Sequence, residues 1–263
     1  MRLRYIDCPA LPGDFNMAAD FILAERMEIK SGKNTGKEAV LRLYTWLRPT
    51  ISLGFHQNSA EIDYSRCRKD GIEVVRRPTG GRAILHWQEL TYCFILPVDE
   101  GEASKSALSR VYQSVHRALG EALSETGAQI SFSLGEKRTP GHNPLCFASS
   151  AGSELEYAGK KALGSAQRLL GKTILQHGSI ILGPHHLLMP EYFNLGQLER
   201  QKLQKLLKEK STYLEIGDSA VLRRAIAEKI AEVFHLELLD DDFTLVEKQE
   251  IEKSRDNFSL LKA

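Results

Sequence analysis

The chain has 263 residues, of which 42% are hydrophobic and 26% are charged. A chain of this size and composition buries a full hydrophobic core and forms one domain, or one domain with a small extension. Its 35 basic and 34 acidic side chains give a formal net charge of +1, so no overall field selects nucleic acid or an anionic membrane. No apolar run approaches the ~18 residues needed to cross a bilayer, and Asp7 precedes any signal-type apolar stretch. We therefore expect a cytoplasmic protein that binds neither nucleic acid nor membranes.

The first half of the chain alternates helical spacing of apolar residues with short apolar runs. A cap at Asp14 followed by apolar residues at helical spacing predicts a helix over 13–30. A second helix is expected over 104–126, where the spacing is regular and Gly127 ends it. The other elements predicted in this half are strands at 40–46, 50–55, 72–76 and 90–96 and a short helix at 61–70.

The second half continues with short strands and then becomes more charged. Strands are predicted at 129–134, 154–157, 162–167 and 174–182, with turns at Ala158-Gly159 and Gly171-Lys172. After Pro190 we expect helices at 198–210 and 218–234, a strand at 236–239 and a further surface helix after Asp240. This order predicts an α+β fold with mixed, largely antiparallel sheets packed with helices. We expect a main domain over 1–196 and a small helical C-terminal extension over 197–263 that packs on it and is not an independent domain.

The segment 76–86 combines paired glycines with arginines. Gly80 and Gly81 have no Cβ, so their backbone amides can approach a ligand, while Arg76 and Arg77 supply positive charge. The pattern indicates a loop that meets an anionic group. The alternative is a tight turn between strands with solvated arginines. The spacing matches neither the phosphate loop nor the dinucleotide fingerprint.

Lys161 lies between a turn and a strand of small residues, 162–167. Small neighbours leave room for a ligand, which makes Lys161 a candidate base or a partner for an acyl carbonyl. The alternative is that Lys160 and Lys161 are turn residues that point into water.

The four cysteines contain no C-x-x-C pair, which is typical of reduced thiols and not of a disulfide framework or a zinc site. Cys93 lies in an apolar strand and is most simply a core residue, whereas Cys67 lies on a charged helix and Cys8 lies near the N-terminus. Only Cys146 has a loop setting suited to nucleophilic attack. A lysine ammonium nearby would favour the reactive thiolate, so Cys146 and Lys161 form a candidate pair if the fold brings them together. By residue type alone, a packing role for Cys146 stays open.

His86 and His177 each end or interrupt an apolar strand, so each is a candidate ligand contact or a hydrogen-bonded core residue. His185-His186 is interpreted as a polar loop pair, because no third ligand is suitably spaced. We expect no metal site.

Four segments, taken in sequence order, resemble landmarks of the lipoyl-assembly branch of the biotin protein ligase and lipoate protein ligase superfamily. They are Asn16-Met17-Ala18, 76–86, 159–167 and His177-Gly178-Ser179, and they span most of the chain. A cysteine in the loop before the lysine strand, with the forms Gly80-Gly81-Arg82 and Gly164-Ser165-Ala166-Gln167, is similar to the octanoyltransferases of that branch. The resemblance implies the biotin/lipoate protein ligase-like catalytic fold for 1–196.

The resemblance also implies an activity. An octanoyl group would pass from an acyl carrier protein thioester to Cys146, and then to a lysine of a lipoyl domain such as the glycine-cleavage H protein, in an early step of protein lipoylation. Cys146 and Lys161 are then catalytic. The substrate-binding residues that it implies are Arg76, Arg77, Gly80, Gly81, His86, Gly164, Ser165 and His177.

Three alternatives stay open beside the octanoyltransferase. An ATP-dependent lipoate ligase would use ATP and Mg²⁺, whereas the octanoyltransferase needs no cofactor. An octanoyl amidotransferase would move the group between lipoyl domains, and an inactive binding module would catalyse nothing. Two positions depart from the family's pattern: Trp87 replaces the usual aspartate, and Ser153 replaces a common aromatic residue. These changes affect the expected acyl pocket or partner surface, not Cys146 or Lys161.

Overall fold

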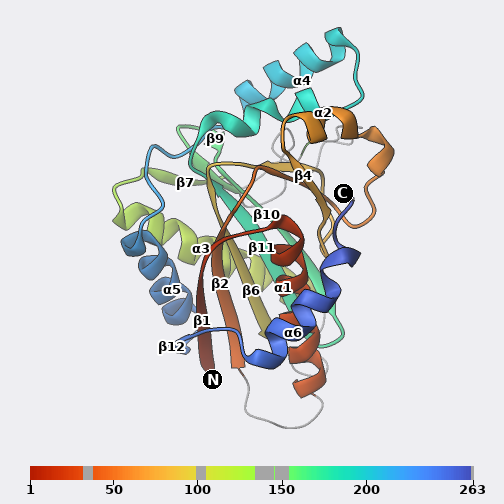
Figure 1. Ribbon diagram of the computed structural model, residues 1–263. Coiled ribbons are helices and arrows are strands. Elements are labelled where there is room, and N and C mark those ends of the chain that lie inside the picture. Colours follow the sequence, from red (N-terminus) through yellow and green to blue (C-terminus); the bar gives the residue numbers. More distant parts are fainter. Residues whose placement is uncertain (32–37, 99–104, 134–144, 146–153, 262–263) are drawn as a thin grey trace.

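The structure is a computed structural model, and it describes residues 1–31, 38–98, 105–133, 145 and 154–261. Its central feature is a six-stranded mixed sheet (Figure 1). The strands of this sheet are β1 (Arg2–Leu11), β2 (Glu38–Trp46), β6 (Glu89–Pro97), β10 (Leu163–Leu170), β11 (Thr173–Ile181) and β12 (Glu237–Asp241). Their spatial order is β10-β11-β6-β2-β1-β12. The pairs β10–β11, β11–β6 and β6–β2 are antiparallel, whereas β1 runs parallel to both β2 and β12.

Two small sheets extend the central one. The first has the order β4 (Glu73–Arg76), β3 (Thr50–Leu53), β5 (Ile84–His86), and the second has the order β7 (Ile130–Ser133), β8 (Glu154–Tyr157), β9 (Lys160–Lys161). Most strand pairs are antiparallel. The predicted α+β class with mixed, largely antiparallel sheets is confirmed.

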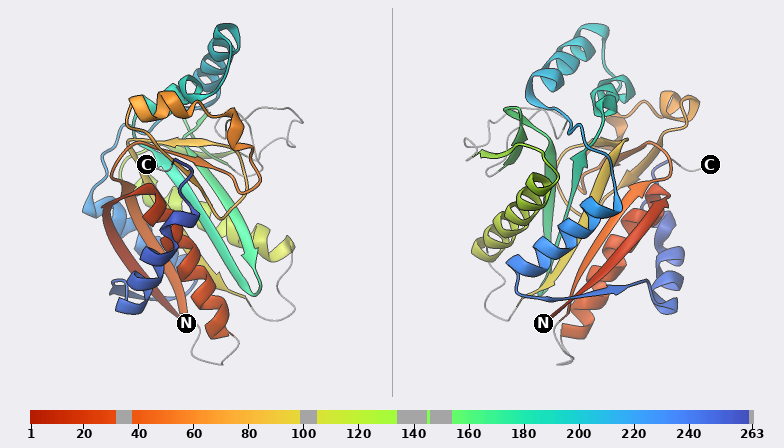
Figure 2. Two further views of the ribbon diagram at one scale, coloured as in Figure 1. Left: turned by 45° about the vertical axis from the view of Figure 1, so that its right-hand side comes forward. Right: turned by 90° about the vertical axis from the view of Figure 1, so that its left-hand side faces the viewer.

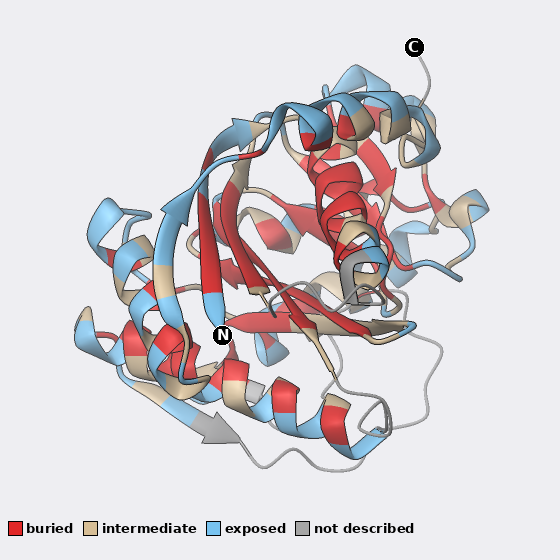
Figure 3. Cartoon of the chain, turned by 90° about the horizontal axis from the view of Figure 1, so that it is seen from below, coloured by how far each residue is buried: buried red, intermediate tan, exposed pale blue. Residues whose placement is uncertain are grey.

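Helices cover both faces of the central sheet (Figure 2). On one face lie α1 (Gly13–Ser31) and α6 (Leu245–Ser254), and on the other lie α3 (Lys105–Glu125) and α5 (Ala220–Val233). Apolar residues of α3 recur every three or four positions, as Val111, Val115, Leu119 and Leu123, so one stripe of the helix is buried. In Figure 3 the helix residues that face the sheet are buried and those that face outward are exposed.

The remaining described helices are η1 (Ser59–Glu61), α2 (Tyr64–Lys69), η3 (Pro184–Tyr192), α4 (Gln197–Lys210) and η4 (Arg255–Asn257). Of these, α4 packs on η3, and η4 packs on α1 and α6. Elements after residue 196 pack against earlier ones: α5 on α3, β12 on β1 and α6 on α1. The boundary at 196 stays a prediction. Within the described ranges, no helix combines the length and the apolar composition that crossing a membrane requires.

Several details of the predicted elements were wrong. The segment 76–86, interpreted as a loop, ends in the strand β5, because Ile84–His86 pair with β3. The strand β1 was not predicted. It lies between two parallel neighbours, β2 and β12, and its buried and exposed residues do not alternate regularly. The helix predicted at 61–70 divides into η1 and α2, since Asp63 caps the second by accepting from the Arg66 amide. The histidine pair is no polar loop, because it lies in η3 with His186 buried.

Candidate functional site

A narrow pocket lies between the central sheet, the start of α1 and the loop that follows β4. Its volume is about 40 Å³, whereas a cavity of roughly 150 Å³ holds benzene. An eight-carbon chain would therefore enter only if lining side chains moved apart. Apolar lining comes mainly from Met17, Trp46, Ile84 and Ala166. The predicted substrate-binding residues that also line it are Arg77, Gly81, His86, Gly164, Ser165 and His177.

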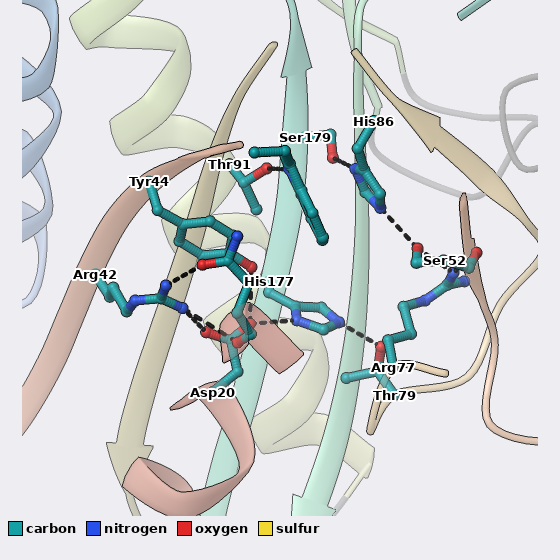
Figure 4. A network of polar contacts seen from close by, with 12 residues as sticks. Asp20, Arg42, Tyr44, Ser52, Arg77, Thr79, His86, Thr91, His177 and Ser179 are labelled. Carbon is teal, nitrogen blue, oxygen red and sulfur yellow. Dashed lines mark hydrogen bonds and ion pairs between the residues drawn. The ribbon is translucent and has the colours of Figure 1, made fainter. Parts of the chain in front are cut away.

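A buried polar network supports one side of the pocket (Figure 4). Asp20 and Arg42 are both fully buried, and Arg42 Nη1 donates to Asp20 Oδ1 at 2.8 Å. The second carboxylate oxygen accepts from Tyr44 at 2.9 Å and lies 2.9 Å from His177 Nδ1. His177 Nε2 lies 2.6 Å from Thr79 Oγ1. The network thus connects α1 and β2 to the loop between β4 and β5.

The ionisation states in this network follow from burial and charge. Burial opposes ionisation of Asp20, but the hydrogen bond from His177 and the charge of Arg42 hold its pKa below the ordinary value. Burial lowers the pKa of His177 although Asp20 favours the cation. The neutral imidazole therefore donates through Nδ1 to Asp20 and accepts through Nε2 from Thr79. This fixed pattern of donors holds Thr79, and with it the loop, in place.

A second buried network lies across the pocket. His86 Nδ1 lies 2.7 Å from Glu89 Oε1, and its Nε2 lies 2.7 Å from Ser52 Oγ. Trp46 stacks on the imidazole at 4.0 Å between ring centroids and donates to Glu89 at 3.1 Å. Burial opposes ionisation of Glu89, but His86 and two hydroxyl donors hold its pKa below the ordinary value. This network fixes the end of the pocket formed by Trp46 and His86.

The order Ser52, His86, Glu89 has the hydrogen-bond sequence of a catalytic triad. Ser52 is fully buried, however, and Arg77 Nη1 lies 3.1 Å from its hydroxyl oxygen. Arg77 also donates to the Gly80 and Arg82 carbonyls at 2.8 and 2.7 Å. We therefore assign these groups to holding the loop against β3.

Arg76 and Gly80 do not line the pocket. Arg76 Nη1 donates to three backbone carbonyls, those of Gly54, Phe55 and Gln57, at 2.9 to 3.0 Å. Gly54 and Gly81 must approach closely, since a Cβ on Gly54 would lie 2.1 Å from the Gly81 carbonyl oxygen. The described contacts of the loop arginines thus shape the loop, and their role toward an anionic ligand stays a prediction.

Ser165 directs its hydroxyl away from the pocket. Its Oγ lies 2.6 Å from Tyr92 OH and 2.8 Å from His116 Nε2, on the face that α3 covers. Gly178 lies between Ser165 and Tyr92 in the sheet and must be glycine, because a Cβ there would lie 2.5 Å from the Gly164 carbonyl oxygen. The hydroxyl of Ser165 is therefore engaged by Tyr92 and His116, although the residue lines the pocket.

The candidate catalytic pair is only partly described. Lys161 lies in β9 with 7% of its surface exposed, which excludes the alternative of a solvated turn lysine, and its strand leads into Gly164 of the pocket wall. Cys146 lies outside the described residues. Its chain neighbour Leu145 is buried and pairs with Ala83, next to Ile84 of the pocket. The juxtaposition of Cys146 with Lys161 stays a prediction.

The sequence did not identify Asp20, Arg42, Tyr44 and Glu89 as part of the site. A usable signal was present, because Arg42 and Glu89 are charged residues inside or beside strongly apolar strands. Cys93 is fully buried, as predicted. In the part of the chain that the structure describes, no cluster of three or more His, Cys, Asp or Glu side chains is arranged to hold a metal ion.

An α+β fold with a narrow pocket between its sheet and a glycine-containing loop is typical of a domain that binds a small ligand. The family model described as the lipoyl protein ligase A/B catalytic domain matches residues 12–234. The chain belongs to this family.

Curated relatives that are 31–39% identical to this chain are octanoyltransferases named LipM. The LipM of Clostridioides difficile (strain 630) is 32% identical over 269 residues, which cover 94% of this chain and 92% of that protein. The LipM of Carboxydothermus hydrogenoformans is 39% identical over 180 residues, which cover 68% of this chain and 64% of that protein.

Solved structures of lipoate protein ligases share the fold. The bipartite lipoate protein ligase from Thermoplasma acidophilum aligns with a TM-score of 0.76 and 18% identity, covering 97% of this chain and 92% of that chain. A lipoate-protein ligase A bound with ATP aligns with a TM-score of 0.71 and 18% identity, covering 97% and 94%. The predicted lipoate ligase-like fold is confirmed.

Proposed function

We propose that this protein moves an octanoyl group from the thioester of acyl carrier protein, through Cys146, to a lysine of a lipoyl domain such as the glycine-cleavage H protein. The observation that carries the proposal is the similarity to a LipM octanoyltransferase along 94% of the chain. On this basis the chain is an acyltransferase that acts in protein lipoylation.

The proposed chemistry has two steps. The Cys146 thiolate attacks the thioester carbonyl, and the pantetheine thiol leaves with a proton, so one thioester replaces another at little cost in free energy. The lysine amine of the lipoyl domain then attacks the acyl-enzyme, Cys146 leaves as the thiol, and a more stable amide remains. Neither step requires ATP. In this proposal the Lys161 ammonium favours the thiolate and orients the carbonyl, and Lys161 in its neutral form receives the proton of the amine.

The described residues around the pocket support this assignment. Leu145 is held against Ala83 and Lys161 precedes Gly164, so both candidate catalytic residues are joined to pocket walls by short stretches of chain. The walls formed by Met17, Trp46 and Ala166 suit an acyl tail. Burial of about seven carbons at ~0.8 kcal/mol per CH₂ gives roughly 5–6 kcal/mol, enough to favour octanoyl over short chains.

Incubation of the pure protein with octanoyl carrier protein, without ATP, tests the proposal. Intact mass should show one added octanoyl group that hydroxylamine removes, and Cys146→Ser should abolish it. Transfer to a lipoyl domain should follow when that domain is added. The Lys161→Ala variant should keep its fold and acylate slowly or not at all.

Other results identify the alternatives. Octanoate transfer that needs ATP and survives Cys146→Ser indicates a lipoate ligase. Acylation by an octanoylated lipoyl domain but not by carrier protein indicates an amidotransferase. Failure with every donor indicates an inactive binding module.

A further inference from the structure

The end of helix α4 contacts the short strand β9 that carries Lys161. Lys160 Nζ donates to the Lys208 carbonyl at 2.7 Å, and the Thr212 amide donates to the Lys161 carbonyl at 3.0 Å. Ser211, the residue that ends α4, forms a parallel bridge with Lys161. Carbonyls in the last turn of a helix lack helical partners and carry partial negative charge, so an ammonium group is favourable there.

His186 also contacts the end of α4, through a hydrogen bond with Ser211. Its Nε2 lies 3.0 Å from Ser211 Oγ, and its Nδ1 lies 3.2 Å from the Gly183 carbonyl oxygen. In the neutral imidazole Nδ1 donates to Gly183 and Nε2 accepts from the Ser211 hydroxyl; Ser211 Oγ also lies 2.7 Å from the Leu207 carbonyl oxygen, the other acceptor within reach of its one proton. His186 and Ser211 are 3% and 4% exposed. Burial lowers the pKa of His186, so the bridge is made by a neutral imidazole.

These contacts matter because β9 has little support of its own. It comprises two residues, and its register with β8 places Lys161 opposite Glu156 and Lys160 opposite Tyr157. The next residue, Ala162, is held by two further bonds: its amide donates to the Leu155 carbonyl at 3.4 Å, and its carbonyl accepts from the Ile181 amide at 3.0 Å. The position of Lys161 therefore depends on what packs against β9, and the bridge from His186 through Ser211 is a buried, hydrogen-bonded part of that support.

We propose that His186 and Ser211 are positioning residues for Lys161: they fix the end of α4 against β9 and so set where the lysine stands in the acyl-transfer site. The inference rests on the proposed function, in which Lys161 must meet the sulfur of Cys146. A misplacement of about 1 Å at a reacting centre can cost on the order of 10²-fold in rate. Neither residue touches the reacting atoms in this scheme.

The pH profile of Cys146 alkylation by iodoacetamide tests the inference directly, with the modified peptide identified by mass. The other cysteines, Cys8, Cys67 and Cys93, are buried. If Lys161 favours the thiolate, Lys161→Ala raises the midpoint of the profile. His186→Ala should move the midpoint in the same direction and slow octanoyl acyl-enzyme formation about tenfold. His186→Gln, which keeps a polar group able to bridge, should restore most of both.

A double variant separates positioning from general loosening. In the Lys161→Ala background, His186→Ala should leave the alkylation midpoint where Lys161→Ala alone puts it, because the lysine through which it acts is gone. Ser219→Ala, which removes the cap of α5 at Leu222, should lower stability and leave the midpoint unchanged. An unchanged midpoint in His186→Ala, or equal shifts in both backgrounds, overturns the inference. If the wild-type protein is never acylated, the proposed function is overturned instead. If Lys161→Ala does not move the midpoint, Lys161 has no part in the mechanism and this inference fails as well.

Discussion

At the scale of single residues, the most deeply buried charges described at the site are those of the ion pair between Asp20 and Arg42. Both side chains are fully buried, and each has lost its contact with water. Arg42 also donates to the Asn16 side chain and to Cys8 Sγ, and its guanidinium lies 3.8 Å above the Tyr44 ring. A buried pair of this kind adds little net stability, but removal of one partner leaves an uncompensated charge.

Asp20→Asn should therefore lower the free energy of unfolding by roughly 3–5 kcal/mol. The substitution keeps the shape of the side chain and removes the charge that balances Arg42. Urea unfolding at neutral pH measures the loss. The matched control is Asp70→Asn in the surface pair with Arg66, which should leave the midpoint almost unchanged because exposed pairs are screened by water. Equal losses in the two variants would contradict this account of the network.

Stability should also depend on pH through the same residues. The folded protein lowers the pKa of Asp20 and of Glu89 from ordinary values of 3.8 and 4.5, and lowers that of His177 from 6.5. At each group the unfolded chain binds protons more tightly than the folded protein does. The two carboxylates thus stabilise the fold fully above their ordinary pKa values, and this contribution is lost as the pH falls through their folded values.

The free energy of unfolding should accordingly decrease from pH 7 to about pH 3. The part due to His177 should begin to fall below about pH 6.5, because only the unfolded histidine readily takes a proton there. Urea midpoints across this range measure the slope, and Glu89→Gln should flatten its acidic part. A midpoint that rises on acidification would show that the assigned directions are wrong.

At the scale of elements, the loop between β4 and β5 depends on residues 258–260, which pack beside β4. The Arg76 amide donates to the Phe258 carbonyl, and the Leu260 amide donates to the Val74 carbonyl, each at 2.8 Å. Val75 forms an antiparallel bridge with Ser259, so these residues lie beside β4 as a further short strand. Phe258 packs on Phe21 of α1, with ring centroids 5.8 Å apart. The segment closes an edge of the small sheet from which the loop departs.

Deletion of 258–263 should cost roughly 1–3 kcal/mol from the two hydrogen bonds alone. Hydrogen exchange should accelerate at the Arg76 amide, because its acceptor is gone and the edge of β4 is open to water. Deletion of 262–263 alone serves as the control and should leave that exchange rate unchanged. Equal protection of Arg76 in both truncated chains would mean that the segment does not hold β4.

The sequence was most informative where a pattern repeats locally. The helix over 105–125 and the strands β6 and β11 were predictable because their apolar residues recur at a fixed spacing or in continuous runs. Arg4 obscured β1, since a charged residue argues against a buried strand unless its partner is known. That partner, Glu247, lies at the other end of the chain, 2.7 Å from Arg4 Nη1.

For the site, too, residues in local sequence patterns were predictable, whereas contacts made by the tertiary fold were not. The glycine pair, His86 and His177 stand in recognisable segments, and the structure brings His86, His177 and Gly81 to one pocket. Asp20 and Arg42 come from a helix and a strand whose contact only the tertiary fold creates. Likewise, nothing in the residues around Ser165 indicated that its hydroxyl would face α3 rather than the pocket.

At the scale of the whole molecule, the elements after residue 196 complete cores that begin earlier in the chain. Leu222, Ile226 and Ile230 of α5 are at most 1% exposed in the core beneath α3. Ile251 of α6 is fully buried in the core beneath α1. A large buried apolar side chain contributes about 1.5–3 kcal/mol, so α5 alone contributes an amount comparable with the roughly 5–15 kcal/mol that stabilises a typical domain.

A fragment of residues 1–196 should therefore fail to fold cooperatively, whereas the full chain should unfold in a single transition. Both tryptophans, Trp46 and Trp87, lie within 1–196, so their fluorescence reports on this part in either protein. Urea unfolding should give one sigmoidal curve for the full chain, coincident with that from circular dichroism, and a broad, shallow change for the fragment. If the fragment instead unfolds sharply at the midpoint of the full chain, residues 1–196 form a domain that is stable without 197–263. In that case the apolar surface exposed by the truncation does not change the free energy of unfolding.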